Sequence, residues 1–302
     1  MAEVQIFDVT ARDGFQNVRD WIPTEVKLAV LDKLVAAGVT HVEATSFVSP
    51  KAVPQMADAG DVVRHMVERH PDVTFSVLAP NLRGAQNAVQ AGATRINYVI
   101  SVSLAHNKAN INRTHEESLS DLASILEALP NLDVTLALAT VFGCPFSGRV
   151  PTEETISLAT KAASLGIRSV ILADTIGVGN PRQVKSVLRA FRSALPEMNV
   201  RLHLHDTHGM GLANMVAALE EGFTVFETAA GGLGGCPFAP GAAGNTATED
   251  AVNMLHRMGV NTGIDLERLL AVVQTLRENL SVPLPGRFAA ARGFQEFCFY
   301  GE

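Results

Sequence analysis

The sequence predicts an α/β protein, a (β/α)8 TIM barrel with extra C-terminal helices. One observation is a repeat in which a helical segment ends at glycine and a short apolar strand with a polar end follows. This repeat recurs at residues 37–43, 91–97, 165–174 and 221–227. A second observation is that eight such units in roughly 230 residues match a barrel. A doubly wound sheet is the alternative, but no glycine-rich phosphate fingerprint follows the first strand.

The predicted strands are short runs of almost continuous apolar residues, as expected when both faces of a parallel sheet are covered. We place them near residues 4–8, 39–44, 74–78, 95–100, 133–139, 168–172, 200–205 and 224–228. Helical periodicity between them predicts helices that include 24–37, 58–69, 116–129, 152–164, 181–195 and 212–221. A glycine just after a helix caps it in a left-handed conformation and turns the chain into the next strand.

We expect residues 1–302 to form a single catalytic domain, because no clear linker divides the chain. Residues from about 248 to 302 are interpreted as a helical C-terminal extension that includes a proline-rich stretch at 282–287. A length of 302 residues suits this organisation.

Composition narrows the classes of function. The net charge is −7 and no basic stripe is present, so we expect no nucleic-acid partner. No apolar run approaches the roughly 18 residues of a membrane span, and a strand-like segment begins at Val4, which leaves no room for a targeting peptide. The three cysteines are far apart and odd in number, which predicts a reducing cytoplasm rather than a disulfide framework.

The most informative motif is His203-Leu204-His205 on an apolar strand. Two histidines at i and i+2 point to the same face of a strand, which is how a strand presents two imidazoles to one metal ion. The alternative interpretation is a half-buried strand with two hydrogen-bonded histidines. About thirty residues further on, a glycine-rich loop carries Cys236 and ends at Asn245, which suggests metal-assisted chemistry that a loop closes off from water.

Other polar residues fall where strands end, and in a barrel the chemistry lies at the carboxyl ends of the strands. An aspartate after a strand is most often a cap or turn residue, so their shared location carries the prediction. The residues concerned are Asp8, Arg12, Asp13, Glu43, Ser46 and Asp174.

Two imidazoles, one carboxylate and one amide oxygen make a mixed nitrogen and oxygen site. With water or substrate it fills an octahedron, which favours Mg²⁺ or Mn²⁺, with Zn²⁺ or Co²⁺ as alternatives. A structural zinc site would recruit several thiolates, and only Cys236 is near. We therefore interpret this cysteine as reactive.

Five segments together resemble the 3-hydroxy-3-methylglutaryl-CoA lyases, which belong to the metal-dependent TIM-barrel lyases and acyl-CoA condensing enzymes. The resemblance runs in order from the first strand to about residue 260. The Arg-Asp-Gly and His-x-His elements are shared by the wider superfamily, whereas the Gly-Leu-Gly-Gly-Cys-Pro loop is more specific to the lyases. The segments are Thr-Ala-Arg-Asp-Gly-Phe-Gln-Asn at 10–17, Glu-Ala-Thr-Ser-Phe-Val-Ser-Pro at 43–50, Asp-Thr-Ile-Gly at 174–177, His-Leu-His-Asp-Thr at 203–207 and the loop at 232–237.

The resemblance implies a role for each matching residue. Asp13, His203, His205 and Asn245 would ligate a divalent cation. Arg12 would bind the thioester oxygen and stabilise an enolate, and Cys236 would donate or accept a proton on a mobile loop. Glu43 and Asp174 would order the site. The substrate pocket would be lined by Gln16, Ser46 and Asn110.

The activity that the resemblance implies is cleavage of 3-hydroxy-3-methylglutaryl-CoA to acetyl-CoA and acetoacetate, as in leucine degradation. The partner would be an acyl-CoA thioester, and the protein would be a homo-oligomer, a dimer or a tetramer. The general base is left open among His203, Asp13 and Cys236.

Several positions depart from the family pattern. Thr135 and Ala137 stand where the lyases usually carry arginine and tyrosine on strand five, and Ile171 replaces a serine. Phe15, the pair at 18–19 and His208 also differ. These changes either indicate a different acyl group or are neutral drift.

The alternatives are therefore a lyase for a branched, longer-chain or citramalyl-type 3-hydroxyacyl-CoA, and a CoA-free pyruvate aldolase. A condensing synthase is less favoured because no large C-terminal regulatory domain follows the barrel. From a different class, a non-catalytic metal-binding barrel would need neither Arg12 nor Cys236.

Overall fold

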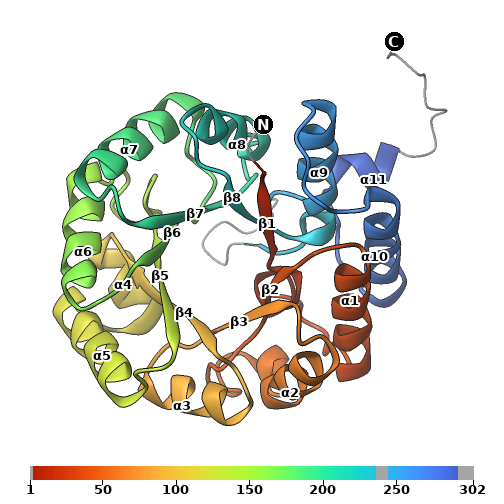
Figure 1. Ribbon diagram of the computed structural model, residues 1–302, viewed down its shortest axis with the longest axis horizontal. Coiled ribbons are helices and arrows are strands. Elements are labelled where there is room, and N and C mark those ends of the chain that lie inside the picture. The colour runs from red at the N-terminus through yellow and green to blue at the C-terminus, as the bar shows by residue number, and fades with distance from the viewer. Residues whose placement is uncertain (1–2, 236–243, 292–302) are drawn as a thin grey trace.

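Eight parallel strands close into a barrel in chain order, and helices surround it (Figure 1). The computed structural model describes residues 3–235 and 244–291. The (β/α)8 prediction is confirmed. The strands are β1 (Gln5–Asp8), β2 (His41–Ser46), β3 (Thr74–Leu78), β4 (Arg95–Ser101), β5 (Asp133–Ala139), β6 (Ser169–Asp174), β7 (Asn199–Leu204) and β8 (Val225–Thr228).

Most predicted helices are found where the periodicity placed them, and three short helical turns accompany them. The sequence did not single out α3 or α4. The helices are α1 (Thr24–Ala36), α2 (Ala59–Arg69), α3 (Leu82–Gln90), α4 (Leu104–Ile111), α5 (His115–Ala128), α6 (Thr152–Ser164), α7 (Pro181–Ala194), α8 (Gly211–Glu220), α9 (Thr248–Arg257), α10 (Leu266–Asn279) and α11 (Arg287–Ala291). The short turns are η1 (Thr10–Gly14), η2 (Pro54–Met56) and η3 (Ala230–Gly232).

Strand ends differ from the predicted bounds in ways that matter for the site. β2 and β6 each run two residues further than the predicted bounds, so Ser46 ends β2 instead of lying beyond it, and Asp174 is the last residue of β6, the strand end at which it was expected. The reason is pairing, because Ser46 pairs with Leu78 and Asp174 pairs with Leu204 on the neighbouring strand. Sequence patterns mark where apolar residues stop, whereas the ladder of hydrogen bonds decides where a strand stops.

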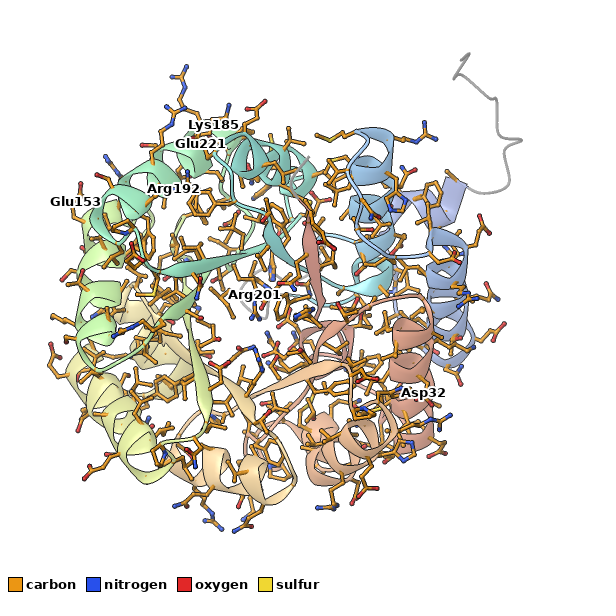
Figure 2. The ribbon with its side chains drawn as sticks, in the orientation of Figure 1. Asp32, Glu153, Lys185, Arg192, Arg201 and Glu221 are labelled. Carbon is orange, nitrogen blue, oxygen red and sulfur yellow. The ribbon has the colours of Figure 1, made fainter. Side chains whose placement is uncertain are left out.

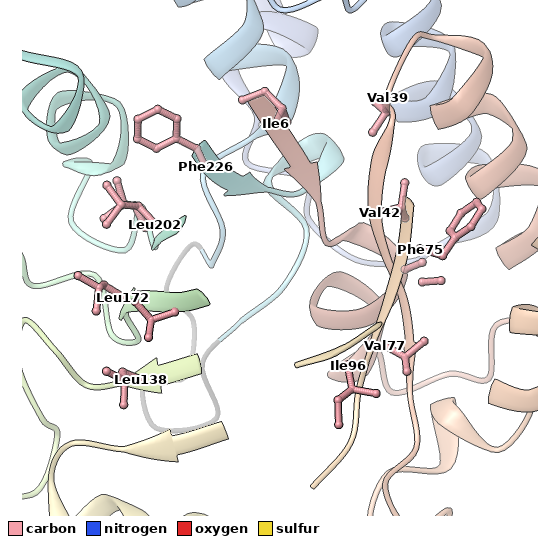
Figure 3. Packing of buried hydrophobic residues seen from close by; sticks show 14 of the residues in the cluster. Ile6, Val39, Val42, Phe75, Val77, Ile96, Leu138, Leu172, Leu202 and Phe226 are labelled. Atoms are coloured by element: carbon pink, nitrogen blue, oxygen red, sulfur yellow. The ribbon is translucent and has the colours of Figure 1, made fainter. Parts of the chain in front are cut away.

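The core lies between the barrel and its helices. Alternate strand residues point outward into this layer, and Figure 3 shows Leu138, Leu172 and Leu202 on three neighbouring strands. Each of these leucines is fully buried. The residues between them face the inside of the barrel, so the outward set fixes which side chains line the site.

The segment after β8 adds α9, α10 and α11, which lie on the side of the barrel next to α1 (Figure 1). The assignment of residues 1–302 to one domain with a C-terminal extension from about 248 stays a prediction. No helix among the described residues is long and apolar enough to cross a membrane.

Two buried carboxyl groups, Asp8 and Glu249, lie beneath the turn that follows β8. Asp8 accepts hydrogen bonds from Thr10 N (2.9 Å) and Thr248 Oγ1 (2.8 Å). Glu249 Oε2 accepts from Gly231 N at 2.9 Å, while its Oε1 is buried without a hydrogen-bond partner. Burial raises the pKa of Asp8 to about 6 and that of Glu249 to about 7. These carboxyls therefore hold the start of the loop that bears Cys236. Because burial disfavours their ionised forms, the stability that they contribute depends on pH.

We expect Glu249→Gln to weaken the dependence of stability on pH. Because burial raises the pKa of Glu249, the folded protein binds more protons than the unfolded chain between about pH 4.5 and 7. Its contribution to stability is thus full below pH 4.5 and is lost as pH rises through 7. Glutamine cannot ionise. The free energy of unfolding of the variant, relative to that of wild type, should therefore rise by roughly 2–3 kcal/mol between pH 5 and pH 8.

Urea unfolding at the two pH values measures this gain. Glu25→Gln, the same change at an exposed position on α1, is the matched control. An unchanged pH dependence in Glu249→Gln would contradict this account of the buried carboxyl.

Candidate functional site

The first site residues lie on η1, a single π-helical turn directly after β1. The backbone N–H groups of Arg12, Asp13 and Gly14 all point at Val9 O, with N···O distances of 3.2, 2.8 and 3.2 Å. Such turns are rare and often occur at functional sites. Here the turn sends two consecutive side chains, Arg12 and Asp13, into the mouth of the barrel.

The two histidines of the His-x-His motif meet inside the barrel. His203 Nε2 and His205 Nε2 are 2.9 Å apart, and both side chains are buried. His203 Nδ1 lies 2.8 Å from Glu227 Oε2. A carboxylate accepts only, so we assign the ring proton of His203 to Nδ1, which leaves the lone pair of Nε2 facing His205.

Asn245 reaches this pair because the chain returning from the glycine-rich loop is joined to the end of β7. His205 and Asn245 form an isolated antiparallel bridge, and Asp206 N donates to Gly244 O at 2.8 Å. The Asn245 amide Nδ2 donates to Asp13 Oδ2 at 2.8 Å. Residues from β1, β7 and the loop after β8 thus converge.

Asp13, His203 and His205 form a group that could hold a metal ion, since their ligand atoms all lie within 4.8 Å of one another. His205 Nε2 is 3.8 Å from Asp13 Oδ2, and His205 Nδ1 is buried without a hydrogen-bond partner. Burial opposes ionisation of Asp13, but Arg12, His205 and His203 together outweigh it and hold the pKa of Asp13 well below its usual value. Burial lowers the pKa of His205. An ionised carboxylate and a neutral imidazole are the forms that bind metals, so Asp13 and His205 fit a divalent cation, and the Nε2 lone pair of His203 adds a third donor.

Arg12 is fixed in orientation by two carboxylates. Its Nε donates to Glu43 Oε2 and its Nη1 donates to Asp13 Oδ1. Glu43 is held in turn, because its Oε1 accepts from Asn97 Nδ2 at 2.7 Å. Arginine has five N–H donors, so a guanidinium bound in this way keeps donors for a ligand in the cavity.

A second ion pair lies deeper in the barrel. Arg201 Nη1 donates to Glu227 Oε1 at 3.0 Å, and its guanidinium carbon lies 3.4 Å from the centre of the Phe7 ring. Figure 2 shows Arg201 near the middle of the barrel. Burial would lower the pKa of His203, but its hydrogen bond to Glu227 and the charge of that carboxylate outweigh burial and raise it.

Sequence reasoning missed Glu227, Arg201 and Asn97 as parts of the site. The available signal was position, because Glu227 is a polar residue next to the last residue of the eighth strand. Glu227, like Glu43, orients a neighbouring side chain.

One cavity at the carboxyl ends of the strands joins these groups. Of the predicted site residues, those that border it are Arg12, Asp13, Gln16, Glu43, Asn110, His203 and His205. Asn245 is buried and contacts Asp13. Ser46 and Asp174 are fully buried and are not among the residues that border the cavity. Cys236 lies outside the described residues.

The Asp174 carboxylate accepts hydrogen bonds from the backbone of the loop after β6. Its Oδ1 accepts from Val178 N at 3.1 Å and its Oδ2 accepts from Gly179 N at 2.9 Å. Burial raises its pKa against these hydrogen bonds. The carboxylate therefore shapes the loop after β6 from below the cavity.

Comparison with known proteins agrees with the geometry. The HMGL-like family model matches residues 3–276. The hydroxymethylglutaryl-CoA lyase YngG of Bacillus subtilis is 44% identical over 287 residues, which is 94% of this chain and 96% of the relative. An (R)-citramalyl-CoA lyase of Chloroflexus aurantiacus is 39% identical over 296 residues, which is 94% of this chain and 93% of the relative.

Solved structures give the same result. The crystal structure of the Bacillus subtilis HMG-CoA lyase has a TM-score of 0.93 and 43% identity, and the match covers 97% of this chain and 98% of that one. An Acinetobacter baumannii HMG-CoA lyase in complex with coenzyme A and 3-methylmalate has a TM-score of 0.92 and 40% identity, with coverage of 99% and 97%. The resemblance seen in the sequence is confirmed, and the chain belongs to the HMGL-like family.

Proposed function

We propose that this chain is a divalent-metal-dependent carbon–carbon lyase that cleaves 3-hydroxy-3-methylglutaryl-CoA to acetyl-CoA and acetoacetate. The observation that carries the proposal is the convergence of Asp13, His203 and His205 beside a fixed Arg12 in one cavity. The lyases among the relatives support it.

The cation would be held by Asp13, His203, His205 and the amide oxygen of Asn245. We propose Mg²⁺ or Mn²⁺, with Zn²⁺ or Co²⁺ as alternatives, because the donors are nitrogen and oxygen. When bound, a divalent cation supplies Lewis-acid polarisation of the substrate hydroxyl and a neighbouring oxygen. Glu227 would keep the Nε2 lone pair of His203 directed at the site.

Arg12 would bind the thioester oxygen. As the bond between C2 and C3 breaks, electrons move onto this oxygen, and a preorganised guanidinium there is worth about 3–4 kcal/mol by analogy with other oxyanion sites. Burial works against the charge of Arg12, but Glu43 and Asp13 outweigh it and raise its pKa, so the group stays charged. Gln16 and Asn110 border the cavity and would contact the acyl-CoA, with Ser46 supporting the wall from behind.

Two proton transfers complete the reaction. The 3-hydroxyl loses its proton as it becomes the ketone of acetoacetate, and C2 of the acetyl-CoA enolate gains one. His203, Asp13 and Cys236 are the candidates for the base, and Cys236 is our candidate for the proton donor to C2. Glu43 and Asp174 would order the site without contacting the reacting atoms.

A second candidate activity is cleavage of a citramalyl-CoA-type thioester. It is favoured by the relative named (R)-citramalyl-CoA lyase and by the small or apolar side chains at Ala137 and Ile171 in the cavity. A cytoplasmic location, a homo-oligomeric state and a place in leucine degradation stay predictions.

A coupled assay tests the proposed function. Protein stripped with chelator and reloaded with Mg²⁺ or Mn²⁺ should form acetyl-CoA and acetoacetate in equal amounts from 3-hydroxy-3-methylglutaryl-CoA. Cleavage of citramalyl-CoA alone would transfer the assignment to the second candidate. Absence of turnover with every thioester and every metal would remove the lyase proposal.

We expect Asp13→Ala and His205→Ala to lose bound metal and activity together, because each change removes one of the proposed metal ligands. Metal content after reloading, measured by mass spectrometry, checks this. His208→Ala, an exposed histidine of the same loop region, should keep its metal. Full metal occupancy in both ligand variants would show that the ion binds elsewhere.

Arg12→Gln should leave metal content nearly unchanged and lower kcat at least ~100-fold, because its interaction grows in the transition state. Steady-state kinetics on the reloaded variant measure the effect. A rise in KM alone, with kcat preserved, would mean that Arg12 only holds the substrate.

Cys236→Ser should keep metal and substrate affinity but lose most turnover, since a hydroxyl is a far poorer proton donor than a thiol. Cys144→Ser is the control, because Cys144 lies buried beside Ser103 and away from the proposed ligands. Turnover of Cys236→Ser near the wild-type rate would take the thiol out of the chemistry.

A further inference from the structure

The cavity has two chemically different sides. One side carries the charged groups around Arg12 and the two histidines. On the other side, a set of six hydrocarbon side chains that we call the apolar wall comes from four neighbouring strands, β3 to β6. It consists of Leu78, Val99, Ala137, Ala139, Ile171 and Ala173. The polar residues Asn97, His106, Asn110 and Thr175 also border the cavity.

The apolar wall faces open space. On β5, Leu136 and Leu138 point toward the helices and are fully buried, whereas Ala137 and Ala139, which alternate with them, are only partly buried. Both alanines border the cavity, so their methyl groups meet empty volume and not packed side chains. Three of the six wall side chains are alanine, which makes this side of the cavity a recess.

No cation serves this recess within residues 3–235 and 244–291. Among the lysine and arginine residues of these ranges, Arg12 borders the cavity, and its Nε and Nη1 already bind carboxylates. Arg201 pairs with Glu227 and is not among the lining residues. A carboxylate placed against these six side chains would lose its hydration without gaining an ion-pair partner from them.

We propose that the apolar wall receives an alkyl branch on C3 of the substrate, and that the enzyme cleaves 3-hydroxy-3-alkylglutaryl-CoA thioesters whose branch is longer than methyl. This inference rests on the proposed lyase function and extends its substrate class. The carboxylate arm then lies on the charged side. The 3-hydroxyl loses its proton, the bond between C2 and C3 breaks, and C2 gains a proton, which yields acetyl-CoA and a longer 3-oxoacid.

Ala137 is the residue that sets the depth of the recess. It lies on the middle strand and is in register with Val99 on β4 and Ile171 on β6. A larger side chain at 137 would fill the space between these two neighbours. Alanine at this position leaves room for several methylene groups of a ligand.

The test compares the 3-methyl, 3-ethyl, 3-propyl and 3-butyl thioesters on the metal-loaded enzyme. Burial of each methylene should raise kcat/KM about threefold to fourfold until the recess is full. Ala137→Leu should lower the ratio of kcat/KM for the butyl thioester to kcat/KM for the methyl thioester at least tenfold. Ala137→Val serves if the leucine variant does not fold, and Ala128→Leu is the matched control at an exposed position on α5.

The outcomes separate this inference from the lyase proposal. If the methyl thioester is cleaved and kcat/KM for the longer branches is at least tenfold lower, the inference is overturned and the lyase proposal stands. An equal loss for all branches in Ala137→Leu would overturn Ala137 as the determinant. If no thioester is cleaved, the lyase proposal is overturned, and cleavage of the longer branches with it. Calorimetric Kd values then test the recess alone: Kd falling with branch length supports it, and Kd independent of branch length contradicts it.

Discussion

The arrangement of the site depends on two imidazole nitrogens, His203 Nε2 and His205 Nε2, being held 2.9 Å apart inside a barrel. This separation is that of a hydrogen bond between the two rings, and contacts outside the pair fix where the pair lies. Glu227 fixes His203 through Nδ1, and the bridge to Asn245 fixes the backbone of His205. The alternation of side chains along the strand directs both imidazoles to the same face, and the contacts with Glu227 and Asn245 hold them there.

The charges around the pair form linked ion pairs. Arg12 bridges Asp13 and Glu43, while Arg201 neutralises Glu227. Buried charges persist in proteins when they are paired and hydrogen-bonded, and these groups satisfy that condition across four different elements. The same contacts that stabilise the buried charges also aim the guanidinium and the imidazole into the cavity, so stability and positioning have a common origin.

Much of this could be predicted from sequence, because a continuous apolar strand and a His-x-His spacing leave little choice of geometry. The π-helical turn at η1 could not, since no residue pattern distinguishes it from an ordinary turn after β1. Glu227 was missed because a carboxylate near a strand end resembles a cap. The strand position of Ser46 follows from pairing between β2 and β3, which a local pattern does not contain.

The central claim is that both imidazoles bind one divalent cation. The most direct test is pulsed electron paramagnetic resonance of the protein loaded with Mn²⁺, which detects nitrogen atoms bonded to the metal. The account predicts one bound Mn²⁺ per chain with echo modulation from two imidazole nitrogens, reduced to one in His205→Ala when residual metal is bound. Binding of Mn²⁺ with no nitrogen modulation in the wild-type protein would contradict it.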